Sequence, residues 1–270
     1  MHIKRILTAI AIVIVLAGAI YGGPPVLAVL AAIIGVLAVY EFFYMMGQTY
    51  GYKPFNPICV WSMITCVAII VGGNIWPSRF VFGSLLISFL VSVAITLYYY
   101  NRAVKNVVEI LKDHVFATLY ITLPLALGIS VVSEPNGIAW LFFLFLAVFA
   151  SDIGAFYVGS FFGKHKLCPT ISPNKSVEGA IGGFVLSMVC TLIYQEIWLP
   201  EFSLTETFPL AFLCAIAAQI GDLFESVIKR SMGVKDSGTI LPGHGGVLDR
   251  IDSLLMAIPV FYVMKFFVYT

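Results

Sequence analysis

The sequence predicts an all-α polytopic integral membrane protein, with about nine transmembrane helices and a cytoplasm-facing polar site in its C-terminal half. Of the 270 residues, 60% are apolar and only 11% are Asp, Glu, Lys or Arg, and the mean hydropathy is +1.00. Nine apolar stretches approach the roughly 20 residues that a membrane-spanning helix needs. The period-two alternation of membrane β-strands is absent, and backbone groups in hydrocarbon must be paired, so these stretches are expected to be helices.

The nine predicted helices follow one another along the chain. They cover residues 6–20, 25–43, 57–75, 80–99, 115–132, 137–158, 180–199, 208–228 and 251–268. The first could also be a signal peptide, because two basic residues precede it and small residues at 17–19 resemble a cleavage site. We favour a retained helix, since the apolar stretch continues to Pro24.

Lysine and arginine are divided unequally between the two sides of the predicted bundle. One side collects 13 of the 15, namely Lys4, Arg5, Lys53, Arg102, Lys105, Lys112, Lys164, Lys166, Lys175, Lys229, Arg230, Lys235 and Arg250. Cytoplasmic loops are enriched in basic residues, so this side, with the N-terminus, is expected in the cytoplasm and the C-terminus outside. The prediction is a multi-pass protein of the cell (inner) membrane, whose basic face suits lipid head groups or nucleotide phosphates.

The chain falls into two parts by its chemistry. Residues 1–146 form apolar helices with plain connections and are expected to be a scaffold, whereas residues 147–270 have cytoplasmic loops dense in polar residues and glycine. The five cysteines lie mostly in apolar segments and form no CxxC pattern, so neither a disulfide framework nor a zinc site is expected.

The first polar cluster lies near the end of the helix predicted at 137–158. A carboxylate inside a spanning helix costs about 2.5 to 3.5 kcal/mol on insertion scales, so Asp152 is expected to face a cavity, a cation or a partner. The alternative is a plain ion pair with a nearby lysine. Gly159 and Gly163, at GxxxG spacing, are expected to pack helices together.

The second polar cluster is SPNKSVEG at residues 172–179. Ser172 or Asn174 is expected to cap the helix predicted at 180–199, and a helix N-terminus beside Lys175 is a ready anion site. The alternative is an ordinary loop-to-helix start, in which Lys164, Lys166 and Lys175 only determine orientation in the membrane.

The third polar cluster begins at the end of the helix predicted at 208–228. Asp222, Ser226 and Lys229 fall at i, i+4 and i+7, which places a carboxylate and an ammonium on one helix face. The segment Pro-Gly-His-Gly-Gly at 242–246 is too glycine-rich for a helix and could fold its N–H groups into an anion-binding nest. His244 in this loop is either a catalyst or a hydrogen-bonding spacer.

The next predicted helix opens with Asp249 and Asp252 at i and i+3, on one face. Acidic oxygen ligands without cysteine or clustered histidine suit Mg²⁺ far better than Zn²⁺. Carboxylates for a hard cation, bases for phosphates and a flexible loop together indicate phosphoryl or nucleotidyl transfer. The alternative is a basic loop with ion pairs at the membrane edge, which the density of the cluster disfavours.

Residues 226–252, with their KR, KDSG, LPGHGG and LDRID elements, resemble the signature of phosphatidate cytidylyltransferases, also called CDP-diacylglycerol synthases. SPNKSVEG and the SDIGA segment at 151–155 resemble that family's other polar elements, so the likeness covers about the last 120 residues. The resemblance implies a membrane nucleotidyltransferase of phospholipid biosynthesis that joins CTP to phosphatidic acid, giving CDP-diacylglycerol and pyrophosphate. It also implies a Mg²⁺ requirement, K⁺ as an additional cation and a homodimer with contacts expected in residues 1–146, and no nucleic-acid partner is expected.

In this interpretation each polar residue receives an expected role. The expected catalytic residues are Asp222, Lys229, Asp249 and Arg250. The expected substrate-binding residues are Ser172, Lys175, Ser176, Glu178, Arg230, Lys235, Asp236, His244, Gly245 and Gly246. The expected Mg²⁺ ligands are Asp222, Asp249, Asp252 and Asp152, and Asp222 and Asp249 are expected to share the ion across an antiparallel helix pair.

Two other functions remain as alternatives. A CTP-dependent lipid kinase of the polyprenol or phytol type would attack the γ-phosphorus of CTP, and the complete LPGHGG and LDRID elements speak against it. A membrane transporter would also carry intramembrane aspartates, but it should show paired repeats with a site at the midplane. Here the polar groups gather at one face and in one half of the chain.

Overall fold

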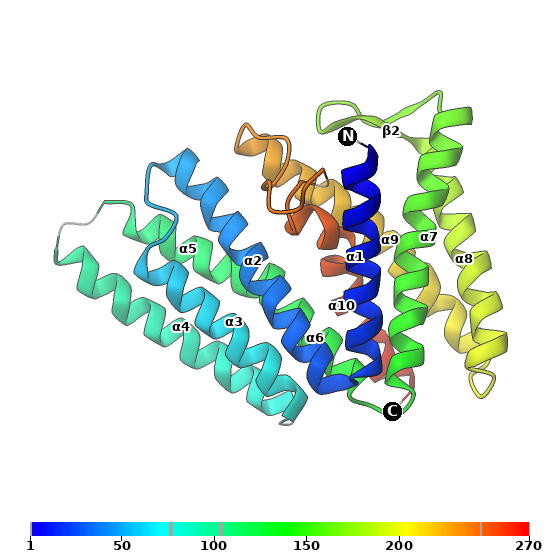
Figure 1. The fold of residues 1–270 in the computed structure, drawn as a ribbon, viewed down its shortest axis with the longest axis horizontal. Coiled ribbons are helices and arrows are strands. Elements are labelled where there is room, and N and C mark those ends of the chain that lie inside the picture. Colours follow the sequence, from blue (N-terminus) through cyan, green and yellow to red (C-terminus); the bar gives the residue numbers. More distant parts are fainter. Residues whose placement is uncertain (1, 76–77, 103–104, 244, 270) are drawn as a thin grey trace. The chain divides into compact units, whose positions relative to one another are not determined.

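The computed structural model describes residues 2–75, 78–102, 105–243 and 245–269, which are mostly helical (Figure 1). The helices are α1 (His2–Tyr21), α2 (Pro24–Tyr50), α3 (Pro57–Ile75), α4 (Ser78–Tyr100), α5 (Val107–Ala117), the π-helix η1 (Thr118–Thr122), α6 (Leu123–Val132), α7 (Gly137–Phe162), α8 (Val177–Trp198), α9 (Leu204–Ser231) and α10 (Leu248–Tyr269). Two strands, β1 (Lys166–Cys168) and β2 (Ser172–Ser176), form an antiparallel hairpin between α7 and α8.

Seven helical segments in the described part of the chain are long and apolar enough to cross a membrane. They are α2, α3, α4, the continuous run α5–η1–α6, α7, α8 and α9. The remaining two predicted segments coincide with α1, whose apolar part is Leu7–Tyr21, and with α10. The all-α polytopic membrane class is therefore confirmed, while the total of nine spans stays a prediction.

The helix predicted at 115–132 begins earlier than hydropathy indicates, and part of it is a π-helix instead of an α-helix. It starts at Val107 and includes the π-turn Thr118–Thr122 just before Pro124. Proline has no N–H to donate to the preceding turn, and a π-turn is a common local adjustment of the helical ladder.

The predicted helix started too late because polar residues precede residue 115, and the structure shows how these residues are accommodated. Asp113 and His114 are buried in α5. The Tyr52 hydroxyl donates to Asp113 at 2.5 Å, and the His114 ring shares hydrogen bonds with the hydroxyls of Ser62 and Ser88 at 2.7 and 3.2 Å. Burial, and then the hydrogen bond to Asp113, raises the pKa of Tyr52, which lies in the loop before α3. Partners of this kind make buried polar groups tolerable among apolar helices.

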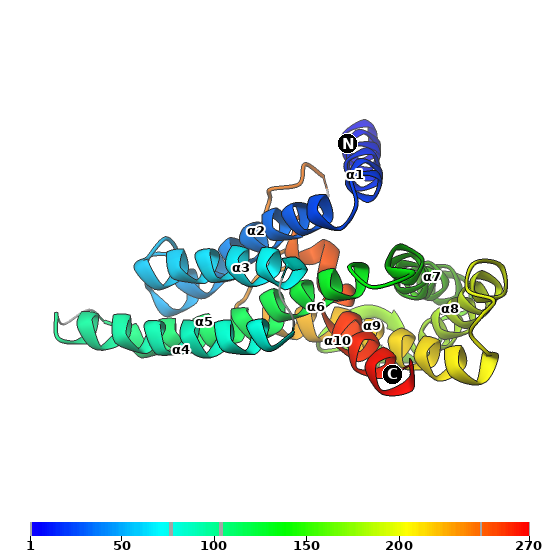
Figure 2. The same ribbon diagram turned by 90° about the horizontal axis from the view of Figure 1, so that it is seen from below.

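The chain packs as two compact units. Unit 1 contains Met1–Ser133 and Ser231–Arg250, and unit 2 contains Glu134–Arg230 and Ile251–Thr270. Within unit 1, α2 and α3 lie over α4 and α5 (Figure 2). The packing therefore groups the glycine-rich loop of residues 231–250 with the N-terminal helices, whereas the predicted division at residue 146 was drawn by chemistry alone.

Within unit 2, α7 and α8 run side by side at very close approach (Figures 1 and 2). A Cβ added to Gly154 would lie 2.7 Å from the carbonyl oxygen of Gly182 and 2.9 Å from the Cα of Gly183. Farther along the two helices, a Cβ added to Gly159 would lie 3.5 Å from the Cα of Gly179. Small residues allow membrane helices to approach so closely.

The hairpin corrects one prediction about the start of α8. The cap is neither Ser172 nor Asn174, because both lie in the extended strand β2. The N-cap is Ser176, the last residue of that strand, whose hydroxyl accepts a hydrogen bond from Gly179 N–H at 3.1 Å. Strand pairing with β1 therefore moves the helix start beyond both predicted caps.

The close α7–α8 contact can be tested by Gly154→Ala. The added methyl group would overlap the backbone of α8, so we expect a loss of about 1 to 3 kcal/mol of stability. The measurement is the thermal unfolding midpoint of the purified protein in detergent. Gly83→Ala in α4 is the matched control, because a Cβ there meets nothing within 4 Å. An equal midpoint for both variants would contradict the packing role of Gly154.

Candidate active site

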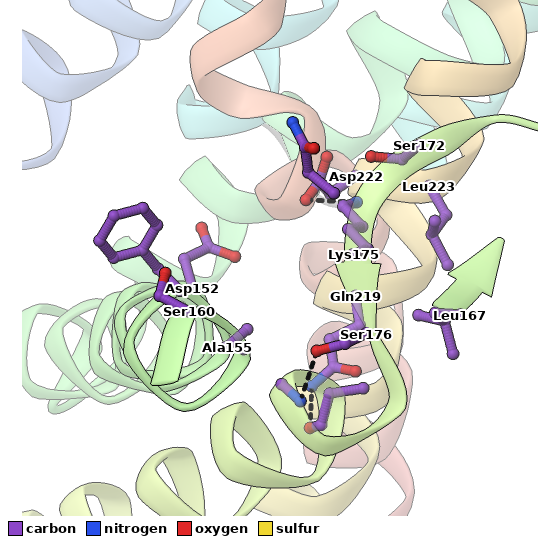
Figure 3. Close-up of a pocket in the computed structure, with 15 residues that line it drawn as sticks. Asp152, Ala155, Ser160, Leu167, Ser172, Lys175, Ser176, Gln219, Asp222 and Leu223 are labelled. Carbon is purple, nitrogen blue, oxygen red and sulfur yellow. Dashed lines mark hydrogen bonds and ion pairs between the residues drawn. The ribbon is translucent and has the colours of Figure 1, made fainter. Parts of the chain in front are cut away.

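A cavity of about 590 Å³ in unit 2 gathers several of the predicted site residues. It is bounded by α7, the hairpin, the start of α8, and α9. Figure 3 shows Asp152 of α7 across the cavity from Lys175 and Asp222. The predicted residues that line the cavity are Asp152, Ser172, Lys175, Ser176 and Asp222.

An ion pair joins the hairpin to α9 inside this cavity. Lys175 Nζ lies 2.6 Å from Asp222 Oδ2 (Figure 3), and the two side chains are 27% and 35% exposed. A pair that remains in contact with solvent contributes only about 0 to 1 kcal/mol to stability. A charged ligand entering the cavity can therefore compete for either partner at low cost.

Three carboxylates of unit 2 share one electrostatic environment. Asp252 of α10 is repelled by Asp222 and by Asp152, and it is attracted by Lys229. By chemical type these donors suit a hard divalent cation, because they are carboxylate oxygens without sulfur or clustered imidazole. Among the residues that the structure describes, no three His, Cys, Asp or Glu side chains are grouped closely enough to hold a metal ion. The assignment of Mg²⁺ ligands therefore stays a prediction.

Basic residues at the end of α9 have partners in the same unit. Lys229 forms an ion pair with Glu225, which is completely buried one turn earlier. Arg230 is exposed, and its Nε–H donates to the carbonyl of Ile171 in the hairpin turn at 3.3 Å. The hairpin is thus tied to α9 through Arg230 as well as through Lys175.

Glu178, predicted to bind substrate, contacts the segment that leads into the hairpin. Its carboxylate accepts hydrogen bonds from the backbone N–H groups of Lys164 and His165 at 3.1 and 3.2 Å, and it lies 2.6 Å from His165 Nδ1. These contacts fix the path of the chain from the end of α7 to β1.

Sequence reasoning missed Gln219, which also lines the cavity. Its side-chain N–H groups donate to Ser151 Oγ at 3.2 Å and to the carbonyl of Ala180 at 2.9 Å, so it links α9 to α7 and α8. The available sequence signal was an amide side chain at the end of an apolar stretch. Its partner Ser151, in the SDIGA segment, lies 68 residues away in the sequence, so the sequence alone did not connect the two.

The glycine-rich loop belongs to unit 1 and is organised by Asp249. The Asp249 carboxylate accepts hydrogen bonds from Ser237 N–H at 2.9 Å, Ser237 Oγ at 3.0 Å and Gly246 N–H at 2.8 Å. Gly243 and Gly245 have φ values of 78° and 83°, which glycine adopts without steric cost. The N–H of Gly246, predicted to contribute to an anion nest, thus donates to a carboxylate of the protein itself.

The remaining predicted residues lie around this loop. Lys235, Asp236 and Arg250 are exposed, and His244 lies outside the described residues. A residue that the sequence reasoning missed, Glu41 of α2, accepts hydrogen bonds from the loop at Ser237 and Leu248.

Comparison with known proteins gives the family. The family model described as "Cytidylyltransferase family" matches residues 3–268. Three relatives carry the name phosphatidate cytidylyltransferase. The protein of Staphylococcus saprophyticus is 42% identical over 132 residues, which cover 49% of this chain and 51% of the relative. The protein of Bacillus subtilis is 41% identical over 131 residues (48% and 49%), and that of Haemophilus influenzae is 43% identical over 137 residues (49% and 48%).

Each of these matches spans about half the length of the relative. The family model, in contrast, extends over nearly the whole chain. The chain therefore belongs to the cytidylyltransferase family.

Proposed function

We propose that this chain transfers the cytidylyl group of CTP to phosphatidic acid, giving CDP-diacylglycerol and pyrophosphate. The observation that carries the proposal is the family match across residues 3–268. The relatives' name, phosphatidate cytidylyltransferase, supports the choice of substrates. A cavity with both a lysine and carboxylates, in a membrane protein, supports it independently.

In the proposed reaction, a phosphate oxygen of phosphatidic acid attacks the α-phosphorus of CTP in line. A new P–O bond forms, the bond from the α-phosphorus to the bridging β-phosphate oxygen breaks, and pyrophosphate leaves with that electron pair. Both reactants are anions, so the main task of the site is to reduce their repulsion with fixed positive charge.

Lys175 and Lys229 are the proposed phosphate-binding cations of unit 2. Each forms an ion pair with a carboxylate of α9, Asp222 or Glu225, so each ammonium is held in place before a ligand arrives. Holding charges in advance reduces the reorganisation that the transition state would otherwise require. Arg250, at the start of α10, is proposed to bind phosphate through its two-pronged guanidinium.

One or two of the carboxylates Asp152, Asp222 and Asp252 are proposed to hold Mg²⁺ in unit 2 together with substrate phosphates, and Asp249 keeps its predicted role in unit 1. A bound Mg²⁺ would neutralise phosphate charge and orient the oxygens. The acyl chains of phosphatidic acid are proposed to remain in lipid, while the head group reaches the site from the cytoplasmic leaflet of the inner membrane. A homodimer, which the family resemblance implies, is part of the same proposal.

The direct test is incubation of purified protein with Mg²⁺, phosphatidic acid and CTP labelled at the α-phosphorus, followed by lipid extraction. Label in the lipid fraction is the expected result. Transfer of label from γ-labelled CTP to the lipid would instead indicate a kinase. Absence of lipid-dependent CTP turnover, combined with solute uptake into vesicles that contain the protein, would indicate a transporter.

The metal assignment in unit 2 can be tested by Asp222→Asn and Asp252→Asn. If both residues hold Mg²⁺, each change should lower kcat by more than the roughly 100-fold typical of outer-sphere partners. The double variant should be little worse than either single variant, because residues that act as one unit are not additive. Expression should be maintained, since removing a charge near the membrane makes insertion easier. Substantial Mg²⁺-dependent activity in both single variants would remove these residues from the metal centre.

The proposed orientation can be tested with single cysteines at two exposed positions, Thr170 in the hairpin turn and Thr239 in the glycine-rich loop. In a Cys168→Ser background, both should react with a membrane-impermeant thiol reagent only after the cytoplasmic face is opened. Pro200→Cys, in the exposed turn between α8 and α9, should react from outside in intact cells. Labelling of Thr170→Cys in intact cells would reverse the proposed orientation.

A further inference from the structure

Glu41 is the one charged residue in the 27-residue helix α2, and it is only 2% exposed. A carboxylate in such a position is costly unless donors surround it. The nearest donors come from a segment about 200 residues away in sequence, the glycine-rich loop of the same unit.

Glu41 accepts a hydrogen bond at the first residue of α10. Its Oε2 lies 2.9 Å from the backbone N of Leu248. The first N–H groups of a helix have no partner within the helix, and a side-chain oxygen just before it usually accepts from them. Val247 precedes Leu248 and has no such oxygen, so Glu41 supplies this acceptor from another helix.

The other contacts of Glu41 are with the loop that precedes α10. The hydroxyl of Ser237 lies 3.3 Å from Glu41 Oε2 and 3.0 Å from Asp249 Oδ2, between two carboxylates. A hydroxyl has one proton, so it can donate fully to only one of them at a time. Glu41 of α2 and Asp249 in the first turn of α10 therefore hold the same serine.

Two glycines of the loop fit closely against Glu41. A Cβ on Gly246 would lie 2.6 Å from Glu41 Oε2, and a Cβ on Gly238 would lie 2.8 Å from Glu41 Cδ. A side chain at either position would have to displace the Glu41 carboxylate. The glycines that sequence reasoning related to an anion nest thus also let the loop close over a carboxylate of α2.

We propose that Glu41 is a positioning residue. It holds residues 237–248 so that Asp249 and Arg250, in the first turn of α10, take the positions that the proposed reaction requires. Its effect on catalysis rests on the proposed function, in which these two residues take part. Its effect on the loop does not depend on that function.

The test compares Glu41→Leu, which removes the acceptor at similar volume, with Glu41→Gln, which retains an acceptor oxygen. Hydrogen–deuterium exchange is measured in peptides that cover Ser237 and residues 246–248. Loss of a hydrogen bond to a charged group should speed exchange there by about tenfold or more in Glu41→Leu, whereas Glu41→Gln should stay within about threefold of the native protein. The hairpin peptide 166–176 should be unchanged in both.

Asp113→Leu is the matched control, because Asp113 is also a buried carboxyl of unit 1 that accepts a side-chain hydrogen bond, but from Tyr52. It should leave exchange in the loop unchanged. Glu41→Asp, whose carboxylate is one methylene shorter, provides a milder variant if Glu41→Leu does not fold, and it too should speed exchange in the loop. In the CTP assay, kcat should fall about tenfold in Glu41→Leu and recover in Glu41→Gln.

The inference is overturned if Glu41→Asp and Glu41→Leu leave loop exchange as in the native protein. It is equally overturned if exchange rises by the same factor in the loop and the hairpin without recovery in Glu41→Gln, since that pattern is a general loss of stability. If the native protein does not convert CTP and phosphatidic acid, the proposed function fails. The exchange result then still decides whether Glu41 holds the loop.

Discussion

Backbone N–H and C=O groups cannot remain unpaired in hydrocarbon, and this constraint determines where the chain can place its chemistry. The described segments of membrane-spanning length are helices, and irregular backbone is confined to the connections. The hairpin and the glycine-rich loop are such connections, and they carry or support most of the candidate site. The buried carboxyl groups Asp113 and Glu41 are found with partners, Tyr52 and the backbone N–H of Leu248.

The sequence predicted the helices well because a spanning segment must be apolar over about 20 residues, and that signal is local. It also selected Asp152, Lys175 and Asp222, which the structure brings to one cavity, because charge in an apolar chain is conspicuous. The hairpin was missed, since two strands of three and five residues are too short to show a recognisable periodicity. The same omission led to the wrong cap for α8.

Glu41 and Gln219 show a different limit of sequence reasoning. Each is a polar residue at the end of an apolar stretch of its helix, which indicates a buried partner but does not identify it. The partners lie 207 residues away for Glu41 and Leu248, and 68 residues away for Gln219 and Ser151. Such pairs depend on how helices pack, so a pattern read along one chain can mark the residue without predicting its role.

The Lys175–Asp222 pair has a consequence for how ligands of opposite charge would bind in this cavity. An anion that draws Lys175 toward itself removes the counter-ion of Asp222, and the exposed carboxylate then attracts a cation more strongly. By thermodynamic reciprocity, a cation at Asp222 releases Lys175 for the anion by the same factor. An anion at Lys175 and a cation at Asp222 thus replace the two partners of the ion pair together. Their binding is therefore cooperative without any movement of a helix.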